Sequence, residues 1–176
     1  MYLIVGLGNP GVEYERSRHN AGFLFVEHLF KKMEFSLDKK FESEIWKIDD
    51  FILAKPQTFM NESGRAIRKI MDYFKLGISS LIVVHDDLDI AFGEYKIQKE
   101  KGPKVHNGLK STEQYLGRSD FWRVRIGVDN RQPGVNYGTG ADYVLSRFSN
   151  EEMKELDKVI EEAKKELIEI LGLNNK

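Results

Sequence analysis

Residues 81–89 read Leu81-Ile82-Val83-Val84-His85-Asp86-Asp87-Leu88-Asp89, an apolar run followed at once by ionisable side chains. A short, fully apolar run is typical of a parallel strand that is covered on both faces. We expect the strand to end near Val84, with the polar residues emerging at the edge of a sheet. Ligands bind at such strand ends in α/β proteins. The stretch therefore predicts both a buried strand and a functional site.

Further strands follow from other short apolar or alternating runs. Tyr2–Leu7 is interpreted as a central strand, because it is apolar and breaks at Gly8-Asn9-Pro10-Gly11. Two runs on either side of Asp49-Asp50 predict a hairpin. These two runs cover residues 43–47 and 51–55, and further strands are predicted over residues 95–99 and 123–128.

Helical spacing accounts for most of the remaining chain. One amphipathic helix is expected to start near Asn20 and another to cover residues 61–74, with Gly77 as its stop. A shorter helix is expected over residues 108–115. Ser149 and Glu152 form a capping box before a long amphipathic run that ends near Gly172. Strands alternating with helices predict an α/β fold: a single three-layer αβα domain, residues 1–176, with a twisted mixed, mostly parallel sheet.

Composition bounds the class of protein. The chain has 176 residues, of which 41% are hydrophobic and 31% charged, as in a soluble globular protein. It contains no cysteine, so disulfides and cysteine nucleophiles are excluded. No signal peptide or membrane span is apparent, and we expect a cytoplasmic protein with no membrane partner. The net charge is −1, but residues 94–131 hold 9 basic and 5 acidic groups, which indicates a phosphate-facing patch.

Gly6-x-Gly8-x-x-Gly11 is a literal match to the dinucleotide-binding fingerprint. Pro10 lies inside the turn, however, and the following segment, 12–19, is polar rather than apolar on one face. The strand-end carboxylates Asp49 and Asp50 also come too late in the sequence for a ribose contact. A glycine turn that lets the backbone curl tightly is the better interpretation.

His19 is the leading candidate for chemistry. If the strands that contain Val5 and Val84 are neighbours, their carboxyl ends bring Asn9, His19 and Asp86 into one crevice. A carboxylate beside an imidazole fixes its tautomer and stabilises the imidazolium, which suits a general base that activates water.

Other readings of the polar residues remain open. His85, Asp86, Asp87 and Asp89 are acceptable ligands for a divalent metal, although no second histidine cluster has ligand spacing, and we expect no metal. No serine lies in a Gly-x-Ser-x-Gly elbow. The amides Asn61 and Asn107 are either helix N-caps or donors that grip a substrate or a developing oxyanion.

Five motifs in order resemble the bacterial-type peptidyl-tRNA hydrolase family. They are Gly6-Leu7-Gly8-Asn9-Pro10-Gly11-x-x-Tyr14-x-x-Ser17-Arg18-His19-Asn20-x-Gly22, Pro56-x-Thr58-Phe59-Met60-Asn61-x-Ser63-Gly64, His85-Asp86-Asp87-Leu88-Asp89, His106-Asn107-Gly108-Leu109-Lys110 and Arg123-x-Arg125-Ile126-Gly127. They span nearly the whole chain, so the match is specific. The resemblance implies an enzyme that cleaves the ester between a peptide and the terminal ribose of tRNA, without a cofactor.

The resemblance also implies roles for particular residues. It makes His19 the general base, Asp86 its partner, and Asn9 the discriminator between peptidyl and free aminoacyl groups. The expected substrate contacts are Tyr14, Phe59, Asn61 and Asn107, with Met60 shaping the crevice. The implied partner is peptidyl-tRNA, and we expect a monomer.

The chain departs from the family pattern in the segment before His106. The family has a glycine-rich run there, whereas this chain has the stiffer and more basic segment 99–105. Two basic residues that the resemblance assigns to tRNA phosphates, Lys96 and Arg125, are kept. Gln98 stands where a further basic group is usual, and Lys99, Lys101 or Lys104 are candidates to replace it.

The fold is also compatible with a second class of function, RNA binding without catalysis. A chloroplast intron-splicing factor shares this fold and resembles the family without the hydrolytic activity, so a non-catalytic RNA-binding protein is the alternative. The complete set of candidate site residues favours the enzyme, because a pure RNA-binding protein has no physical need for it.

Overall fold

The computed structural model describes residues 1–30 and 32–172. Its strands form one seven-stranded sheet in the order β2-β3-β4-β1-β5-β7-β6. The strands are β1 (Tyr2–Gly6), β2 (Ser36–Asp38), β3 (Ser43–Ile48), β4 (Phe51–Pro56), β5 (Leu81–Ala91), β6 (Tyr95–Lys99) and β7 (Trp122–Asp129). β1 lies in the centre, as its apolar sequence predicts.

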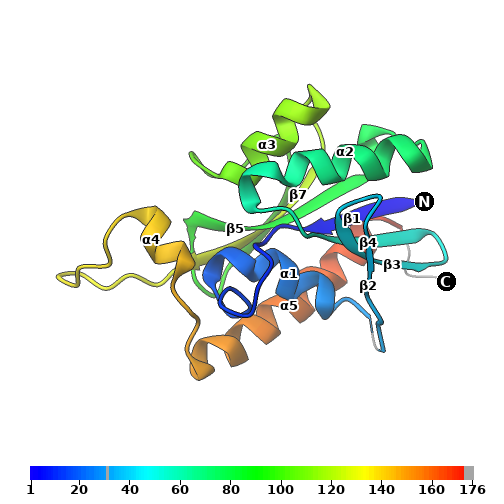
Figure 1. The fold of residues 1–176 in the computed structure, drawn as a ribbon. Helices are drawn as coiled ribbons and strands as arrows, with labels where there is room; N and C mark the ends of the chain where they lie inside the picture. Colours follow the sequence, from blue (N-terminus) through cyan, green and yellow to red (C-terminus); the bar gives the residue numbers. More distant parts are fainter. Residues whose placement is uncertain (31, 173–176) are drawn as a thin grey trace.

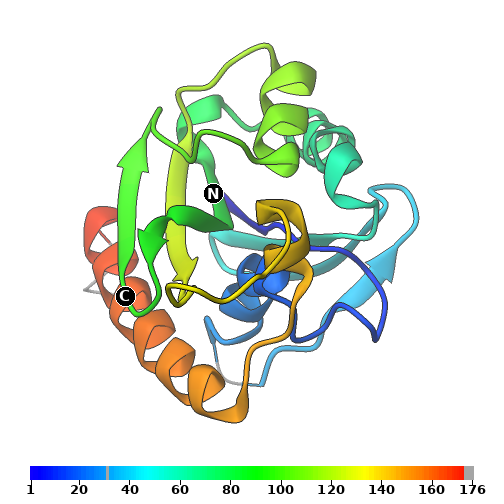
Figure 2. The same cartoon turned by 90° about the vertical axis from the view of Figure 1, so that its left-hand side faces the viewer.

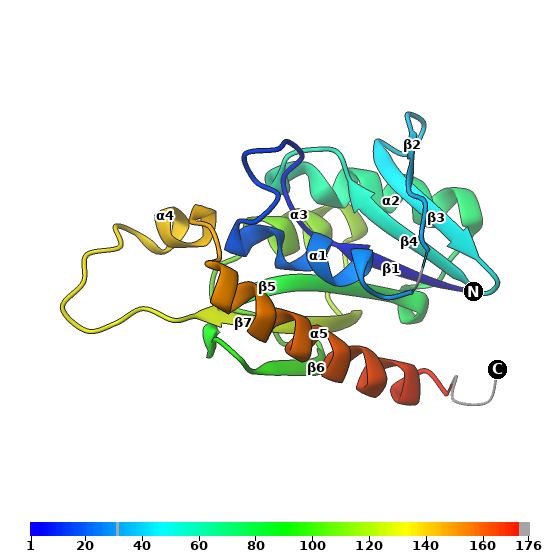
Figure 3. The same cartoon turned by 90° about the horizontal axis from the view of Figure 1, so that it is seen from below.

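Helices cover both faces of this sheet (Figures 1 and 3). They are α1 (Ala21–Glu27), α2 (Ser63–Phe74), α3 (Asn107–Leu116), α4 (Gly140–Leu145) and α5 (Asn150–Ile170), with short 3₁₀ turns η1 (Arg18–Asn20), η2 (Met60–Glu62) and η3 (Ile78–Ser80). α2 and α3 lie on one face, and α1 and α5 lie on the other. The predicted three-layer αβα architecture is confirmed. Among these helices of the described residues, none combines the length and apolar character needed to cross a membrane.

The central strands are parallel and the outer ones antiparallel. β1 pairs in parallel with β4 and β5, and β5 pairs in parallel with β7, whereas β2, β3 and β6 add antiparallel pairings at the two edges. The predicted mixed sheet and the hairpin around Asp49-Asp50 are therefore confirmed. Val5 lies opposite Val83, so β1 and β5 are neighbours as expected.

Alternation along the strands divides the core into two halves. On one face, Ile4, Ile82 and Val124 pack with buried residues of α1 and α5. On the other face, Leu3 and Val83 pack with the apolar side of α2 and with Leu109 of α3. Because both faces of β1 and β5 are buried, the ends of these strands are held rigidly.

Two glycines let the start of α1 approach the centre of the sheet. A Cβ atom on Gly6 would lie 2.2 Å from the carbonyl oxygen of Gly22, and one on Gly22 would lie 2.3 Å from the carbonyl oxygen of Val84. The glycine-rich motif after β1 therefore serves close packing of helix and sheet in addition to the turn, in which Gly11 has a φ of +117°. η1, which carries His19, precedes this contact directly.

Several boundaries differ from the sequence predictions. β5 does not end near Val84 but continues to Ala91, because Asp86 and Asp87 stay paired with Ile126 and Gly127 of β7. α2 ends at Phe74 as predicted, but it begins at Ser63 and not at Asn61, and its C-cap in the left-handed region is Lys75, at a φ of 55°, and not Gly77. Helix boundaries follow local caps more than composition, so errors of this size are common.

Two short elements have no strong signal in the sequence. β2 is a three-residue edge strand with mostly exposed side chains, so its sequence shows no alternation of apolar and polar residues. α4 has six residues, too few for a helical period to be visible, and it is set by a capping box between Thr139 and Asp142. α4 and the preceding loop project from the end of the sheet (Figures 1 and 3), and they lie in front of the strands when the molecule is viewed from that end (Figure 2). α5, by contrast, begins at the predicted capping box of Ser149 and Glu152.

Candidate active site

Two side chains that are distant in sequence meet just beyond the carboxyl end of β1, where β5 continues past its last pair with β1. Nδ1 of His19, in η1, lies 2.8 Å from Oδ1 of Asp86, in β5. The Asp86 side chain is 3% exposed, and that of His19 is 13% exposed. The predicted juxtaposition of these two residues is present, and it places a carboxylate in a dry environment beside an imidazole that solvent can reach.

This environment changes the pKa of both groups. Burial lowers the pKa of His19, but the charge of Asp86 and the hydrogen bond to it raise the pKa by more, so the net shift is upward from 6.5. Burial alone would raise the pKa of Asp86, yet His19 and His106 hold it well below its ordinary value. Asp86 is therefore ionised at neutral pH, and its charge makes His19 a stronger base than a free imidazole.

His106 is a second partner of Asp86. Its Nε2 lies 3.0 Å from Oδ1 of Asp86. Its Nδ1 accepts the backbone N–H groups of Gly108 and Leu109 at the start of α3, so this nitrogen carries no proton and Nε2–H is the donor to Asp86. With Asp86 ionised, Nδ1–H of His19 is the other donor, which leaves Nε2 of His19 as the basic nitrogen. The helix cap thus fixes the tautomers of the site.

Sequence reasoning assigned no role to His106. It offered Asn107 as a possible cap of this helix, whereas His106 is the N-cap and Asn107 is the first helical residue. Asn61 likewise lies in η2 and does not cap α2, whose N-cap is Glu62. The signal that could have found His106 was its place directly before a helix start in a chain with only 4 histidines.

His85 lies beneath the site. It is fully buried and its ring meets that of His106 edge-on, with centroids 5.1 Å apart. Burial and the neighbouring His106 lower the pKa of His85 to about 3, so it is neutral, and its Nδ1–H donates to the backbone oxygen of Asp86. His85 therefore supports the site as a packed, uncharged ring.

Asn9 is held in one orientation by three contacts. Its backbone N–H donates to Oδ1 of Asn20 at 2.9 Å, and Nδ2 of Asn20 donates to its backbone oxygen at 3.0 Å. The Oδ1 atom of Asn9 accepts the backbone N–H of Met60 at 2.8 Å. Because Oδ1 is engaged by the protein, it is the Nδ2 group, a donor, that Asn9 can offer to a ligand.

These residues line a cavity of about 580 Å³. Most of the predicted substrate-binding residues also line it, and Phe59 exposes 61% of its surface there. The lining residues are Asn9, His19, Phe59, Met60, Asn61, Asp86, Leu88, Pro103, Val105, His106, Asn107, Gly140, Ala141, Val144 and Leu145. Tyr14 lies outside this lining, half-buried in the loop before η1. The cavity is mostly apolar, and its polar lining includes amides, imidazoles and the Asp86 carboxylate, as expected for a binding site.

The acidic residues of β5 have separate partners. Asp86 faces the two imidazoles, Asp87 is buried against Arg125 at 2.8 Å, and Asp89 accepts the backbone N–H of Lys104. Successive side chains of a strand point to opposite faces, which separates Asp86 from Asp87, and Asp89 is exposed and hydrogen-bonded to Lys104, so the three carboxylates do not converge as the metal alternative requires. His19, Asp86 and His106 do hold possible ligand atoms within 4.8 Å of one another. Their spacing around Oδ1 of Asp86 is that of two hydrogen bonds.

The two predicted phosphate-binding residues lie opposite one another on β6 and β7. Lys96 is exposed and is the register partner of Arg125. Arg125 is 8% exposed and donates from Nε to Asp87 and from Nη1 to Oε1 of Gln98. Lys96 is thus the more accessible cation, while the Arg125 side chain is already engaged by the protein.

Comparison with known proteins gives a consistent result. The family described as Peptidyl-tRNA hydrolase matches residues 3–175. A Bacillus cereus (strain Q1) protein with the name peptidyl-tRNA hydrolase is 42% identical over 168 residues, which cover 93% of this chain and 89% of that protein. One from Geobacter metallireducens with the same name is 46% identical over 164 residues, covering 90% and 82%.

The solved structures agree with the sequence relatives. The crystal structure of peptidyl-tRNA hydrolase from Acinetobacter baumannii superposes with a TM-score of 0.82 at 33% identity, covering 94% of this chain and 85% of that one. A complex of peptidyl-tRNA hydrolase with N-propanol gives the same values. Because the family match covers almost the whole sequence and the fold agrees, this chain belongs to the peptidyl-tRNA hydrolase family.

Proposed function

We propose that this chain hydrolyses the ester bond between a peptide and the terminal ribose of tRNA, with His19 as the general base and Asp86 as its partner. The activity follows from the family to which the chain belongs. The observation that carries the assignment of the base is the 2.8 Å contact of Nδ1 of His19 with Asp86 at the wall of the cavity. Residues 1–176 are proposed to act as one domain, because all strands of the described residues join one sheet.

The first step is deprotonation of water by Nε2 of His19. Asp86 stabilises the imidazolium that forms, and the hydroxide adds to the ester carbonyl carbon to give a tetrahedral intermediate. The carbon–oxygen bond to ribose then breaks, and the proton held by His19 passes to the leaving ribose oxygen. The products are tRNA with a free ribose hydroxyl and a peptide carboxylic acid, which loses its proton to solvent, so atoms balance with one water consumed.

The negative charge on the tetrahedral intermediate requires a donor. Asn61 and Asn107 line the cavity from different elements, η2 and α3. Their amide N–H groups are uncharged donors, and we assign Asn61 to the oxyanion. A general base contributes about 10²- to 10⁴-fold, and one oxyanion donor about 3 to 4 kcal/mol. This total suits an activated ester rather than an amide bond.

Asn9 is proposed to select substrates with a blocked α-amino group. Its Nδ2 donor suits the carbonyl oxygen of an acylated amino group and repels a free ammonium. Asn9→Asp keeps an oxygen for the Met60 N–H but replaces the donor by a carboxylate oxygen. We expect the preference for N-blocked over free aminoacyl-tRNA to fall about 10- to 100-fold, the scale of a hydrogen bond that involves a charge. The measurement is kcat/KM for both substrates.

A matched control for this change is Asn20→Asp. Asn20 holds the Asn9 backbone with both ends of its amide, so its replacement disturbs the loop without presenting a new group to the substrate. We expect it to lower kcat/KM for both substrates in proportion. An unchanged preference ratio in Asn9→Asp would remove the selecting role.

The exposed side chain of Lys96 is proposed to bind a tRNA phosphate. We expect Lys96→Gln to weaken all tRNAs alike and to reduce the slope of log affinity against log salt by about 0.9, as for the loss of one phosphate contact. Filter binding between 50 and 200 mM salt, as used for such slopes, measures this. Lys158→Gln, on the exposed face of α5, is the control. Equal slopes for Lys96→Gln and the parent protein would contradict the assignment.

The alternative, an RNA-binding protein without hydrolytic activity, is not favoured by the comparisons. The relatives and solved structures compared above carry the name peptidyl-tRNA hydrolase. A monomeric state and a cytoplasmic location stay predictions of the sequence.

A further inference from the structure

A buried arginine lies directly before the proposed base. Arg18 is 6% exposed, although η1, which it shares with His19, is a turn of only three residues. Its guanidinium lies over two aromatic rings, 4.6 Å from the centroid of Tyr143 and 5.1 Å from that of Phe148. Burial of a cation next to a site requires partners that hold it in one place.

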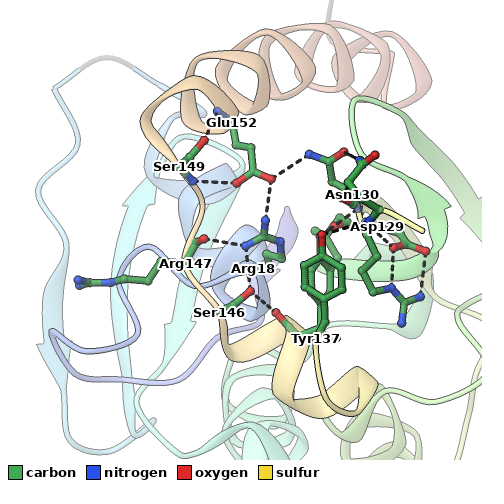
Figure 4. A network of polar contacts seen from close by, with 12 residues as sticks. Arg18, Asp129, Asn130, Tyr137, Ser146, Arg147, Ser149 and Glu152 are labelled. Atoms are coloured by element: carbon green, nitrogen blue, oxygen red, sulfur yellow. Dashed lines mark hydrogen bonds and ion pairs between the residues drawn. The ribbon is translucent and has the colours of Figure 1, made fainter. Parts of the chain in front are cut away.

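The partners of Arg18 come from the connection between α4 and α5. Nη1 donates to Oγ of Ser146 at 3.0 Å and to the backbone oxygen of Arg147 at 2.7 Å, and Nη2 donates to Oε1 of Glu152 at 2.6 Å (Figure 4). The backbone N–H of Arg18 donates to the oxygen of Ser146 as well. Contacts across more than 120 residues of sequence therefore hold the turn that carries His19.

Glu152 joins three elements at one carboxylate. Its Oε2 accepts the N–H of Ser149 in the capping box of α5, and its Oε1 accepts Nδ2 of Asn130 after β7 in addition to Arg18. The N–H of Asn130 in turn donates to the hydroxyl of Tyr143 in α4. The same network thus fixes α4, which forms the Gly140, Ala141, Val144 and Leu145 wall of the cavity.

We propose that Arg18 and Glu152 are positioning residues for the hydrolysis, which hold the His19 turn and the α4 wall at a fixed distance from each other. The proposal rests on the proposed function of His19 as the base. Arg18 contacts no reacting atom in this scheme. It acts by keeping the His19 imidazole aligned with Asp86. It also keeps that imidazole aligned with the ester carbonyl of a substrate bound against α4. Misplacement of a reacting group by about 1 Å costs on the order of 10²-fold in rate.

The main test is Arg18→Met, which keeps an unbranched stem against the two rings and removes every donor. We expect kcat to fall about 10- to 100-fold with KM little changed, because a positioning defect acts on the transition state. The Nδ1 proton resonance of His19, which reports the hydrogen bond to Asp86, is expected to shift or broaden. Glu152→Gln, a milder change, should alter both readouts in the same direction.

Arg123→Met is the matched control. Arg123 is a buried arginine with its guanidinium 4.5 Å from the ring centroid of Phe121 and an ion pair to Glu113 at 2.7 Å, so its loss removes the same kinds of contact elsewhere. We expect it to lower the Tm by a similar amount while kcat and the His19 resonance stay at their parent values. Assays are made well below the Tm of both variants.

The double variant Arg18→Met with Glu152→Gln tests whether the pair acts as a unit. We expect its kcat to equal that of Arg18→Met alone, because residues of one network have non-additive effects. Equal kcat losses in Arg18→Met and Arg123→Met, or an unaltered His19 resonance in Arg18→Met, would overturn the positioning role. A His19→Ala variant with the same rate as the parent protein would instead overturn the proposed role of His19 as the base. The two failures are therefore distinguishable.

Discussion

Replacement of His19 by alanine is expected to lower kcat for release of an N-blocked amino acid from tRNA by about 10²- to 10⁴-fold. The ring is the base that activates water in our scheme, and no second imidazole can replace it. Nε2 of His106 is committed to Asp86, and His85 is buried and neutral. The measurement is single-turnover hydrolysis at saturating enzyme, which separates chemistry from binding.

His28→Ala is a suitable control for this experiment. His28 follows α1 on the surface, well outside the cavity lining, and its Nδ1–H donates to the backbone oxygen of Leu24. We expect it to retain the parent rate. Substrate affinity of His19→Ala should be close to that of the parent protein. Full activity of His19→Ala would eliminate the histidine as the base.

Replacement of Asp86 by asparagine is expected to have the second largest effect. The change keeps the shape of the side chain and an oxygen for the two imidazole donors, but it removes the charge that stabilises the His19 imidazolium. By analogy with other histidine–carboxylate pairs we expect kcat to fall by about 10²-fold or more. Asp89→Asn, on the same strand but with an exposed side chain, is the control for loss of charge.

The pH profile of Asp86→Asn provides an independent readout. In the parent protein the pKa of His19 lies above 6.5, so kcat/KM falls as pH drops through that raised value and His19 becomes protonated. Asparagine removes the charge that raises this pKa, while burial continues to lower it. The acid limb of the profile should therefore move to lower pH, even though the rate at the plateau is reduced. A limb that stays in place would show that Asp86 does not set the pKa of the base.

The sequence predicts the parts of this fold that depend on local composition. The buried strands around Val5 and Val83 and the capping box at Ser149 all appear where apolar runs and cap residues place them. The juxtaposition of His19 with Asp86 was also predictable, because it follows from the adjacency of two parallel strands at their carboxyl ends.

The unpredicted parts depend on contacts between distant residues. The apolar run predicts a strand that ends near Val84, but ion pairs and hydrogen bonds allow the polar residues from His85 to Asp89 to remain in β5. His106 gained its importance from Asp86, 20 residues away. Arg18 forms an ion pair with Glu152, which is 134 residues away in the sequence, and the local sequence around either residue does not predict that pair. Buried polar groups are hard to place from sequence because their partners decide whether burial is favourable.

The close approach of Gly6 and Gly22 has a consequence for how activity data are interpreted. A methyl group at either position brings no new chemistry, yet it wedges the first helix away from the sheet and so separates an imidazole from its carboxylate. Mutational scans that score turnover alone would then count a residue without any functional group among the essential ones. At these two positions, an inactive variant has lost the correct distance between the imidazole and the carboxylate, and it has not lost a reactive atom.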